Sequence, residues 1–318
     1  MRARLLQRAM TLLVGLWGIT CQGQAVGYIN LTCPAGFSLF SDQLYTTNND
    51  PAIVLDNSSG AFNGWQIMIW TNGSFAKYIG NNGSPNTTNG WLEPNGPFAL
   101  NPGVGALLYN PGPQTNLLFL GVVPSGNLTN NLNLGLNLVG SIVPWGGGLS
   151  SLMSFPNLSN GLLDGDQAFL LYAKGTNYGY TLFTADSLSY HPPSNYGWDG
   201  PVGQAEPVLA VGAAFWYRAG NQPVQWIESL SQPAVSPPRV SPSSGHAVGF
   251  SSPAIRQDHR FQATLNGQPG ASYVIEISPD LKVWTPTATN RISAKSWVYR
   301  DPQLATNTAR FYRAFILP

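Results

Sequence analysis

The chain has 318 residues, of which only 9% are charged, and its formal net charge is +1. Charged residues make up about 25% of an ordinary globular chain, and this shortage of Glu and Lys leaves too few strong helix formers for a helical protein. The aromatic fraction of 12% is high enough to build a buried core, which excludes a disordered chain. Short apolar runs broken by Gly, Asn and Pro predict an all-β fold.

Residues 1–25 have the pattern of a secretory signal peptide. A basic start is followed by an apolar run from Ala9 to Ile19 and by the small residues Gly23 and Ala25. The run is shorter than the roughly 20 apolar residues that a membrane-spanning helix needs. We therefore expect a secreted protein, extracellular or on the periplasmic or outer surface, cleaved after about Ala25. Lipidation at Cys21 is the alternative.

Residues 26–230 contain an internal repeat with a period of about a hundred residues. Five short motifs recur in the same order, and the clearest are Asn63-Gly64 with Asp164-Gly165, Gly90-Trp91 with Gly197-Trp198, and Val104-Gly105 with Val211-Gly212. This order predicts two tandem β units, residues 26–123 and 124–230. It also predicts that Gly105 superposes on Gly212 and Trp91 on Trp198.

Asp164 and Asp166 form the acidic pair most suited to hold Ca²⁺ or to act in acid–base catalysis. The first unit has Asn63-Gly64-Trp65 at the matching place, without the acids. Because Asn-Gly and Asp-Gly both favour type I′ turns, we predict a hairpin turn here and keep a metal site at Asp164 and Asp166 as the alternative. The sequence has no H-E-x-x-H, G-x-S-x-G, Walker or C-x-x-C motif. Accordingly, no enzyme activity and no cofactor are predicted.

The matching tryptophans Trp91 and Trp198 have two interpretations. Large aromatic side chains usually contribute by burial, so both are expected in the cores of their units. The alternative is that they form an exposed platform on which sugar rings stack, together with residues such as Trp216.

Residues 231–256 are rich in Pro and Ser and predict a linker. Residues 257–318 then predict an independent C-terminal β-sandwich, because the odd positions Tyr273, Ile275 and Ile277 are all apolar, which is a period of two. Trp284 and Phe311 are expected in the same core.

Charge is distributed unevenly along the chain. Residues 26–238 contain three basic and ten acidic residues, whereas residues 239–318 contain nine basic and four acidic residues. This asymmetry indicates either two independently solvated domains or a basic tail that docks on the acidic front or on an anionic envelope surface.

Two segments of the tail, YVIEISPDLKVWTP (273–286) and RFYRAFILP (310–318), carry a family resemblance. They resemble the short module that closes many secreted bacterial multi-module all-β proteins. The resemblance implies an immunoglobulin-like or fibronectin-III-like sandwich and a structural rather than a chemical role.

Together these features predict a secreted, non-catalytic protein with a structural, adhesive or ligand-presenting role. The alternatives are an extracellular glycan-binding module and, third, a hydrolase accessory protein or a hydrolase with an unrecognised site. A polysaccharide or the cell envelope is the expected partner. Nucleic acid is not expected, because the tail has no RNP-like run or basic helix, and the sequence makes no prediction of oligomeric state.

Overall fold

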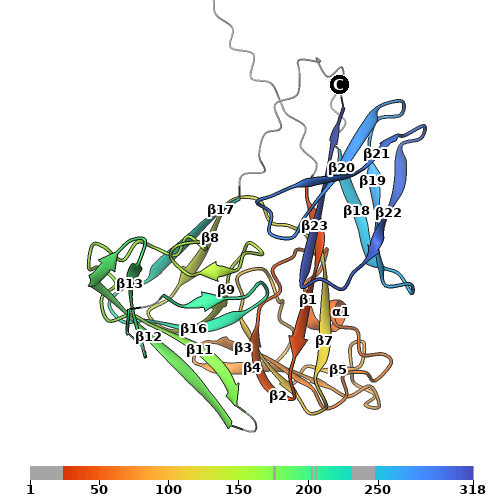
Figure 1. Ribbon diagram of the computed structural model, residues 1–318. Helices are drawn as coiled ribbons and strands as arrows, with labels where there is room; N and C mark the ends of the chain where they lie inside the picture. Colours follow the sequence, from red (N-terminus) through yellow and green to blue (C-terminus); the bar gives the residue numbers. More distant parts are fainter. Residues whose placement is uncertain (1–23, 175–176, 202, 205, 231–247, 318) are drawn as a thin grey trace, which may run out of the picture.

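The computed structural model describes residues 24–174, 177–201, 203–204, 206–230 and 248–317 (Figure 1). These residues form antiparallel strands and one short helix, α1 (Pro51–Val54), which confirms the predicted all-β class. Nearly all of the predicted signal peptide and residues 231–247 of the predicted linker lie outside the described residues. Within the described part of the chain, no helix is long and apolar enough to cross a membrane.

The first unit pairs its strands in a distinctive order. Strand β1 pairs with β7, and a separate sheet has the order β2-β6-β3-β4-β5. The strands are β1 (Val26–Cys33), β2 (Gly36–Phe40), β3 (Gln66–Thr71), β4 (Ser74–Gly80), β5 (Trp91–Leu92), β6 (Ala106–Asn110) and β7 (Thr115–Val122). Helix α1 lies between β2 and β3, and it starts there because Pro51 fits the first helical turn and Asp50 accepts a hydrogen bond from the amide of Ala52 (2.8 Å).

The second unit repeats this order of pairings. Strand β8 pairs with β17, and the second sheet has the order β9-β16-β11-β12-β13-β14. The strands are β8 (Gly126–Leu132), β9 (Gly135–Gly140), β10 (Gly147–Gly148), β11 (Gln167–Lys174), β12 (Asn177–His191), β13 (Asn195–Gly200), β14 (Gly203–Gln204), β15 (Val208–Leu209), β16 (Ala214–Ala219) and β17 (Val224–Leu230). The shared topology supports the predicted repeat, although its origin in a duplication stays a prediction.

Strand pairing changes one of the predicted matches. The amide of Ser41, just after β2, donates to the carbonyl of Gly212, and the amide of Gly140, at the end of β9, donates to the carbonyl of Gly103. Gly212 therefore corresponds to Gly103, and the predicted match with Gly105 is wrong by two residues. The physical reason is backbone conformation, because Gly103 (φ +94°) and Gly212 (φ +79°) both need a residue without a Cβ.

These hydrogen bonds join the two units reciprocally. A backbone bridge pairs Phe40 at the end of β2 with Ala213, and its counterpart pairs Val139 of β9 with Val104. A Cβ on Gly140 would lie 2.3 Å from the Cβ of Ser41, so the two strand ends are in van der Waals contact. The two sheets therefore meet at this junction.

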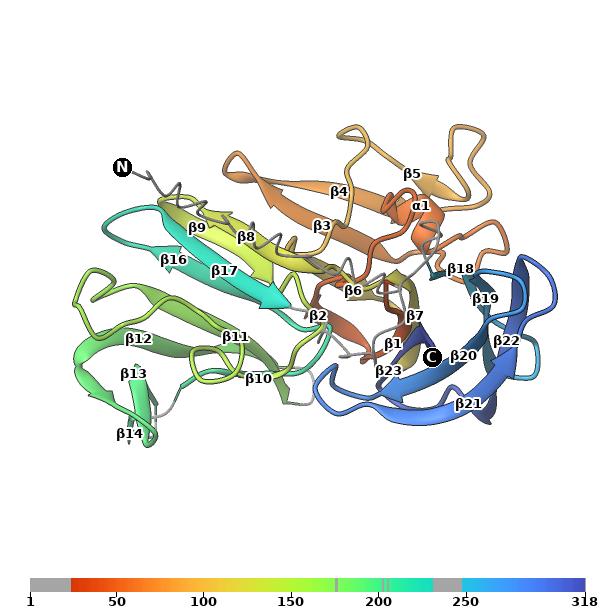
Figure 2. The same ribbon diagram turned by 90° about the horizontal axis from the view of Figure 1, so that it is seen from above.

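The C-terminal strands share a sheet with the first unit. They are β18 (Gly249–Ile255), β19 (Arg260–Asn266), β20 (Ser272–Ser278), β21 (Thr285–Arg291), β22 (Ser296–Leu304) and β23 (Ala309–Ile316). Strand β23 pairs with β1, which gives one sheet of order β21-β20-β23-β1-β7 (Figure 2). The tail is thus not separate from the front in its hydrogen bonding, contrary to the prediction of an independent C-terminal sandwich. The predicted linker is also too long, because β18 pairs with β19 and buries Phe250.

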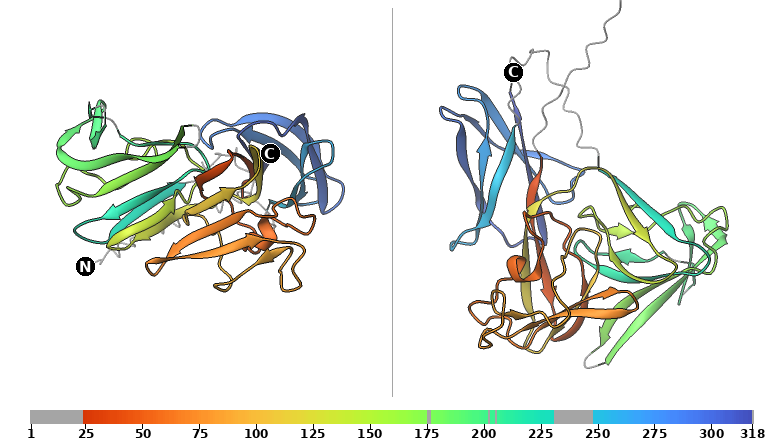
Figure 3. Two further views of the ribbon diagram at one scale, coloured as in Figure 1. Left: turned by 90° about the horizontal axis from the view of Figure 1, so that it is seen from below. Right: turned by 180° about the vertical axis from the view of Figure 1, so that it is seen from behind.

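Strand β1 has an apolar residue on both faces because each face meets a different core. Ile29 and Cys33 face the first unit's core, whereas Val26 and Tyr28 face a core that they share with β18, β19, β20, β22 and β23. Figure 3 shows that the second unit and the C-terminal strands lie on opposite sides of β1 and β7. Strands buried on both faces have nearly continuous apolar sequences, as the start of β1 does.

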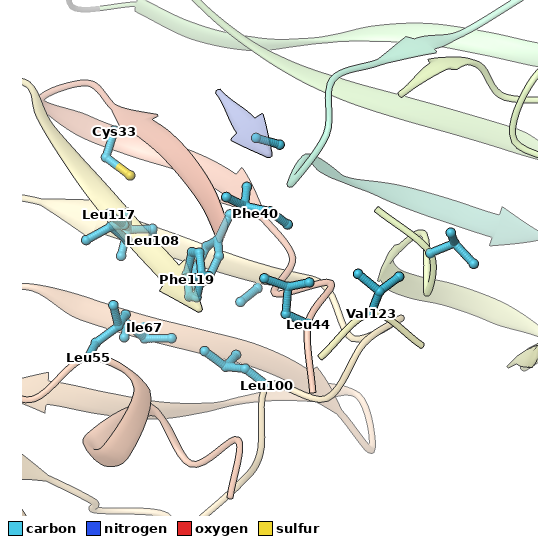
Figure 4. Close-up of a cluster of buried hydrophobic side chains, with 14 of the residues drawn as sticks. Cys33, Phe40, Leu44, Leu55, Ile67, Leu100, Leu108, Leu117, Phe119 and Val123 are labelled. Atoms are coloured by element: carbon cyan, nitrogen blue, oxygen red, sulfur yellow. The ribbon is translucent and has the colours of Figure 1, made fainter. Parts of the chain in front are cut away.

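The core of the first unit packs around Phe40 and Phe119, whose rings stack with centroids 5.8 Å apart (Figure 4). Phe311 of β23 belongs to this core rather than to the tail's own core. In the tail, Tyr273 and Ile275 are fully buried as predicted. Trp284, by contrast, is only half-buried and packs against the first core. The guanidinium of Arg313 lies over its ring, 4.2 Å from the ring centroid.

Candidate functional site

Trp91 and Trp198 do not form an exposed platform. Both side chains are completely buried, and each indole N–H has a partner inside its own unit. Trp91 Nε1 donates to the Leu55 carbonyl (2.6 Å), and Trp198 Nε1 donates to Ser150 Oγ (2.9 Å). Their predicted burial in the two cores is confirmed, and the alternative, a glycan-stacking role for these two residues, is wrong, because a sugar ring cannot reach them. Their matching positions in β5 and β13 follow from a shared role in the cores.

The side-chain oxygens of Asp164 and Asp166 accept hydrogen bonds from other groups of the protein. Both oxygens of Asp164 accept hydrogen bonds from Ser187, from its amide (2.7 Å) and from its hydroxyl (2.8 Å). Asp166 is fully buried and accepts from the Tyr217 hydroxyl and from the Gly220 amide. Burial beside this carboxylate raises the pKa of Tyr217. The described residues contain no cluster of three or more His, Cys, Asp and Glu side chains that could hold a metal.

The Asp-Gly motif forms a turn but not the predicted hairpin. Gly165 has a φ of +84° and its amide donates to the Ala185 carbonyl (2.9 Å), which leads the chain into β11. Gly64 does the same in the first unit with a φ of +82° and a bond to Gly80 (2.8 Å). The motif therefore recurs for its backbone conformation, which both Asn-Gly and Asp-Gly supply.

The residues that the structure does bring together lie between the two units. Met68 and Trp70 point away from the first core, because their neighbours Ile67 and Ile69 pack into it. Trp216 likewise points away from the second core, which takes its neighbours Phe215 and Tyr217. The outer faces of the two sheets thus face one another, and we call the space between them the inter-unit groove. Its wall strands are β2, β3, β4 and β6 on one side and β9, β11 and β16 on the other, and the end of β12 at residues 177–182 extends the second wall beside β11.

Trp70 and Trp216 meet across this groove. Their rings are perpendicular with centroids 5.5 Å apart, and Phe75 contacts Trp216 at 6.0 Å. The Trp216 indole N–H also donates to the Tyr180 hydroxyl of β12 (3.3 Å). Edge-to-face arrangements of this kind are a favourable geometry for aromatic pairs, so the cluster is a stabilising contact between the units.

A second aromatic contact crosses the groove at Phe37. Its ring lies 5.7 Å from that of Tyr178 on β12 and 5.0 Å from that of Tyr109 on β6. The Tyr178 hydroxyl donates to the Ala35 carbonyl (2.9 Å), which ties the β11–β12 hairpin to the edge of the first sheet. Figure 1 shows this hairpin and β2 side by side.

The groove is hollow and partly open to solvent. One hollow of about 620 Å³ is lined by Phe37, Gln66, Met68, Leu107 and Tyr109. A smaller one, of about 250 Å³, lies between β2 and the second sheet, where Phe37, Leu39 and Leu171 contribute to its lining. On the β11–β12 hairpin, Tyr178 and Tyr180 are 39% and 45% exposed. Aromatic rings are thus available to a ligand along the groove.

Trp216 was the one sequence candidate that belongs to this groove. The sequence signal for the others was strands that are apolar on both faces, such as QIMIWT (66–71) and QAFLLYAK (167–174). A strand with one solvated face alternates apolar and polar residues, so these strands indicate a second covered or ligand-binding face. Which strands would face each other depends on long-range pairing that the sequence does not reveal.

No family model, curated protein or solved structure matches this chain. Function is therefore inferred from the groove.

Proposed function

We propose that this protein is an extracellular, non-catalytic glycan-binding protein, and that the inter-unit groove holds the glycan. The observation that carries this proposal is the edge-to-face cluster of Trp70 and Trp216, with the exposed rings of Tyr178 and Tyr180 beside it. This role is the first alternative that the sequence left open beside a structural, adhesive or ligand-presenting protein.

The groove has the chemistry that a sugar requires. A sugar ring presents apolar C–H faces and polar hydroxyl edges, so it suits a site with flat aromatic surfaces and a few polar groups. Here the aromatic surfaces come from Tyr109, Tyr180 and Trp216, and the polar groups from the Tyr hydroxyls and Gln66. The larger hollow, at about 620 Å³, falls in the range of roughly 300–1,000 Å³ that is usual for small-ligand sites.

The composition of the groove walls supports binding rather than catalysis. The seven wall strands contain no Asp, Glu, His or Cys residue. The end of β12 that reaches the groove (residues 177–182) has none either, and Asp186 and His191 of this strand lie farther along it. Hydrolysis of a glycosidic bond ordinarily uses a pair of carboxyl groups on either side of the bond. A glycan bound between these strands would therefore be held without being cleaved.

The extracellular part of the proposal is supported by the leader sequence and by the family resemblance. The basic and apolar leader in residues 1–25 supports export. The resemblance of residues 273–286 and 310–318 to the closing modules of secreted bacterial proteins supports a role at or outside the cell surface.

The test is a glycan array probed with the full-length protein, followed by calorimetric titration of the best ligand. We expect Trp216→Ala to weaken binding about tenfold or more, because one aromatic stacking contact is worth roughly 0.5–1.5 kcal/mol and the Trp70 partner is also released. Trp297→Ala, a half-buried tryptophan of β22 far from the groove, is the matched control and should bind normally. Binding that Trp216→Ala and Tyr180→Ala both leave unchanged would place the ligand elsewhere.

A further inference from the structure

We infer that the inter-unit groove is selective for an acidic glycan, a chain that carries uronic acid carboxylates, with Lys77 and Arg218 as the cations that recognise it. This inference rests on the proposed glycan-binding function and adds the class of ligand.

In the two units, basic and acidic residues lie in different places: the basic residues lie in the wall strands of the groove, and the acidic residues lie outside them. Residues 24–230 contain ten acidic residues but only three basic ones, Lys77, Lys174 and Arg218. All three basic residues lie in wall strands of the groove, in β4, β11 and β16 respectively. All ten acidic residues lie outside the seven wall strands, and Asp186 of β12 lies beyond the end of that strand that reaches the groove (residues 177–182). The walls are therefore locally positive in a part of the molecule that is otherwise negative.

The strand registers place two of these cations on the faces that line the groove. Lys77 is paired with Met68, which lines the larger hollow, so the two share one face of the first sheet. Arg218 is two residues from Trp216 on β16 and therefore shares its face. Its guanidinium donates to the Oε1 of Gln167 on the neighbouring strand (3.3 Å), which orients it along the wall.

Neither cation is neutralised within the described residues. The salt bridges found there are those of Arg310 with Asp301 and of Arg313 with Glu276, both among the C-terminal strands. Arg218 is exposed and has only a neutral amide as partner, and Lys77 is half-exposed. Both charges are therefore free to pair with a ligand, and an arginine fork fits a carboxylate in particular.

The number and spacing of the cations favour carboxylates over sulfates. The cations are single residues on three separate strands, not a continuous basic array. A densely sulfated polymer has a high linear charge and is bound through clusters of Lys and Arg. Single charges beside aromatic surfaces instead match a sugar chain with one carboxylate on a ring.

The experiment compares each linear polyuronate with its own methyl ester, which keeps the backbone and removes the charge. Oligomers of polygalacturonate and of alginate are titrated in both forms at low salt. We expect the free acids to bind about tenfold more tightly than the esters, because the esters lose the two exposed ion pairs with Lys77 and Arg218. The Lys77→Gln, Arg218→Gln double variant should bind both forms equally. Added salt should weaken binding of the acids only.

The control variant carries the same change of charge away from the groove. Arg256→Gln with Arg300→Gln removes two exposed arginines of the C-terminal strands, and their guanidiniums both contact Gln262 there. This control variant should keep the preference for the acids.

Three outcomes would contradict the proposals. If acid and ester bind the wild type equally, the acidic selectivity is wrong while glycan binding stands. If a sulfated glycan binds more tightly than every polyuronate, the carboxylate assignment is wrong. If neither form nor any neutral glycan binds, the proposed function fails as well.

Discussion

The two units have the same strand pairings, but each one stabilises the same loop with a buried carboxyl group from a different place. The loop follows β2 in the first unit and β9 in the second, and it lies near the junction of the two sheets. In the first unit the acid is Asp42, which belongs to the loop itself. In the second unit it is Glu228, which comes from β17.

The contacts of the two acids are equivalent. Asp42 accepts a hydrogen bond from the Leu44 amide (3.0 Å) and one from Asn49 (3.4 Å). Glu228 accepts from the Ile142 amide (2.6 Å) and from the Ser141 hydroxyl. Both acids are almost or entirely inaccessible to solvent.

The strand registers show how the second unit makes room for its acid. Glu228 is paired with Leu128 in the way that Phe119 is paired with Ile29 in the first unit. Glu228 thus takes the position that the buried Phe119 has in the first unit. Ser141 takes the position that Asp42 has in the first unit. The comparison teaches that the fold requires an acceptor for the loop amides, because buried amides without a partner are costly. It does not require that acceptor to come from one position.

The largest expected effect is on the pH dependence of stability. Burial raises the pKa of Asp42 to about 8 and that of Glu228 to about 7, from ordinary values of 3.8 and 4.5. An acid whose pKa is raised on folding stabilises the fold below its unfolded pKa, and this stabilisation is lost as the pH rises through the folded pKa. The free energy of unfolding should therefore fall by several kcal/mol between pH 5 and pH 9, since each pKa unit corresponds to about 1.4 kcal/mol.

Urea unfolding across this pH range measures the effect, and two variants assign it to the units. Asp42→Asn should remove the part of the decrease that extends to the higher pH, and Glu228→Gln the part centred nearer neutrality, because neither amide titrates. If the wild-type stability is flat or rises over this range, both carboxyl groups are ionised in the folded protein and the comparison of the two acids loses its basis.

Next in size is the loss of a matching tryptophan from each core. Trp91→Ala and Trp198→Ala should each lower the free energy of unfolding by about 3–5 kcal/mol, because a fully buried aromatic side chain is replaced by a cavity. Trp284→Ala, which removes a half-buried ring, should cost less. Urea denaturation of the three variants tests this order. A large loss for one matching tryptophan and a negligible one for the other would show that β5 and β13 are not equivalent.

How far the sequence predicted the molecule depends on the range of the interaction. The all-β class and the places of Trp91 and Trp198 in two matching units followed from local patterns, since turns and alternation act over a few residues. The pairing of β23 with β1 joins opposite ends of the described chain, and no local signal marks it. The groove was missed for the same reason, because Trp70 and Trp216 are neighbours only through the junction of the two sheets. The burial of Asp166 also depends on Tyr217, which comes from another strand.

The smallest expected effect concerns the glycines that correspond at the junction. Gly103→Ala and Gly212→Ala each place a Cβ at positive φ, which costs roughly 1–2 kcal/mol. A Cβ at Gly103 would also lie 2.9 Å from Ile142, whereas one at Gly212 would lie 3.2 Å from Leu31 and fit with a small adjustment. Thermal or urea unfolding should therefore rank Gly103→Ala as the less stable variant.

Gly73→Ala is the control for backbone strain alone, because its φ is +78° and no atom lies within 4 Å of the added Cβ. Gly212→Ala should match this control closely, and a loss well below that of Gly73→Ala would mean that the junction does not hold Gly212 in this conformation.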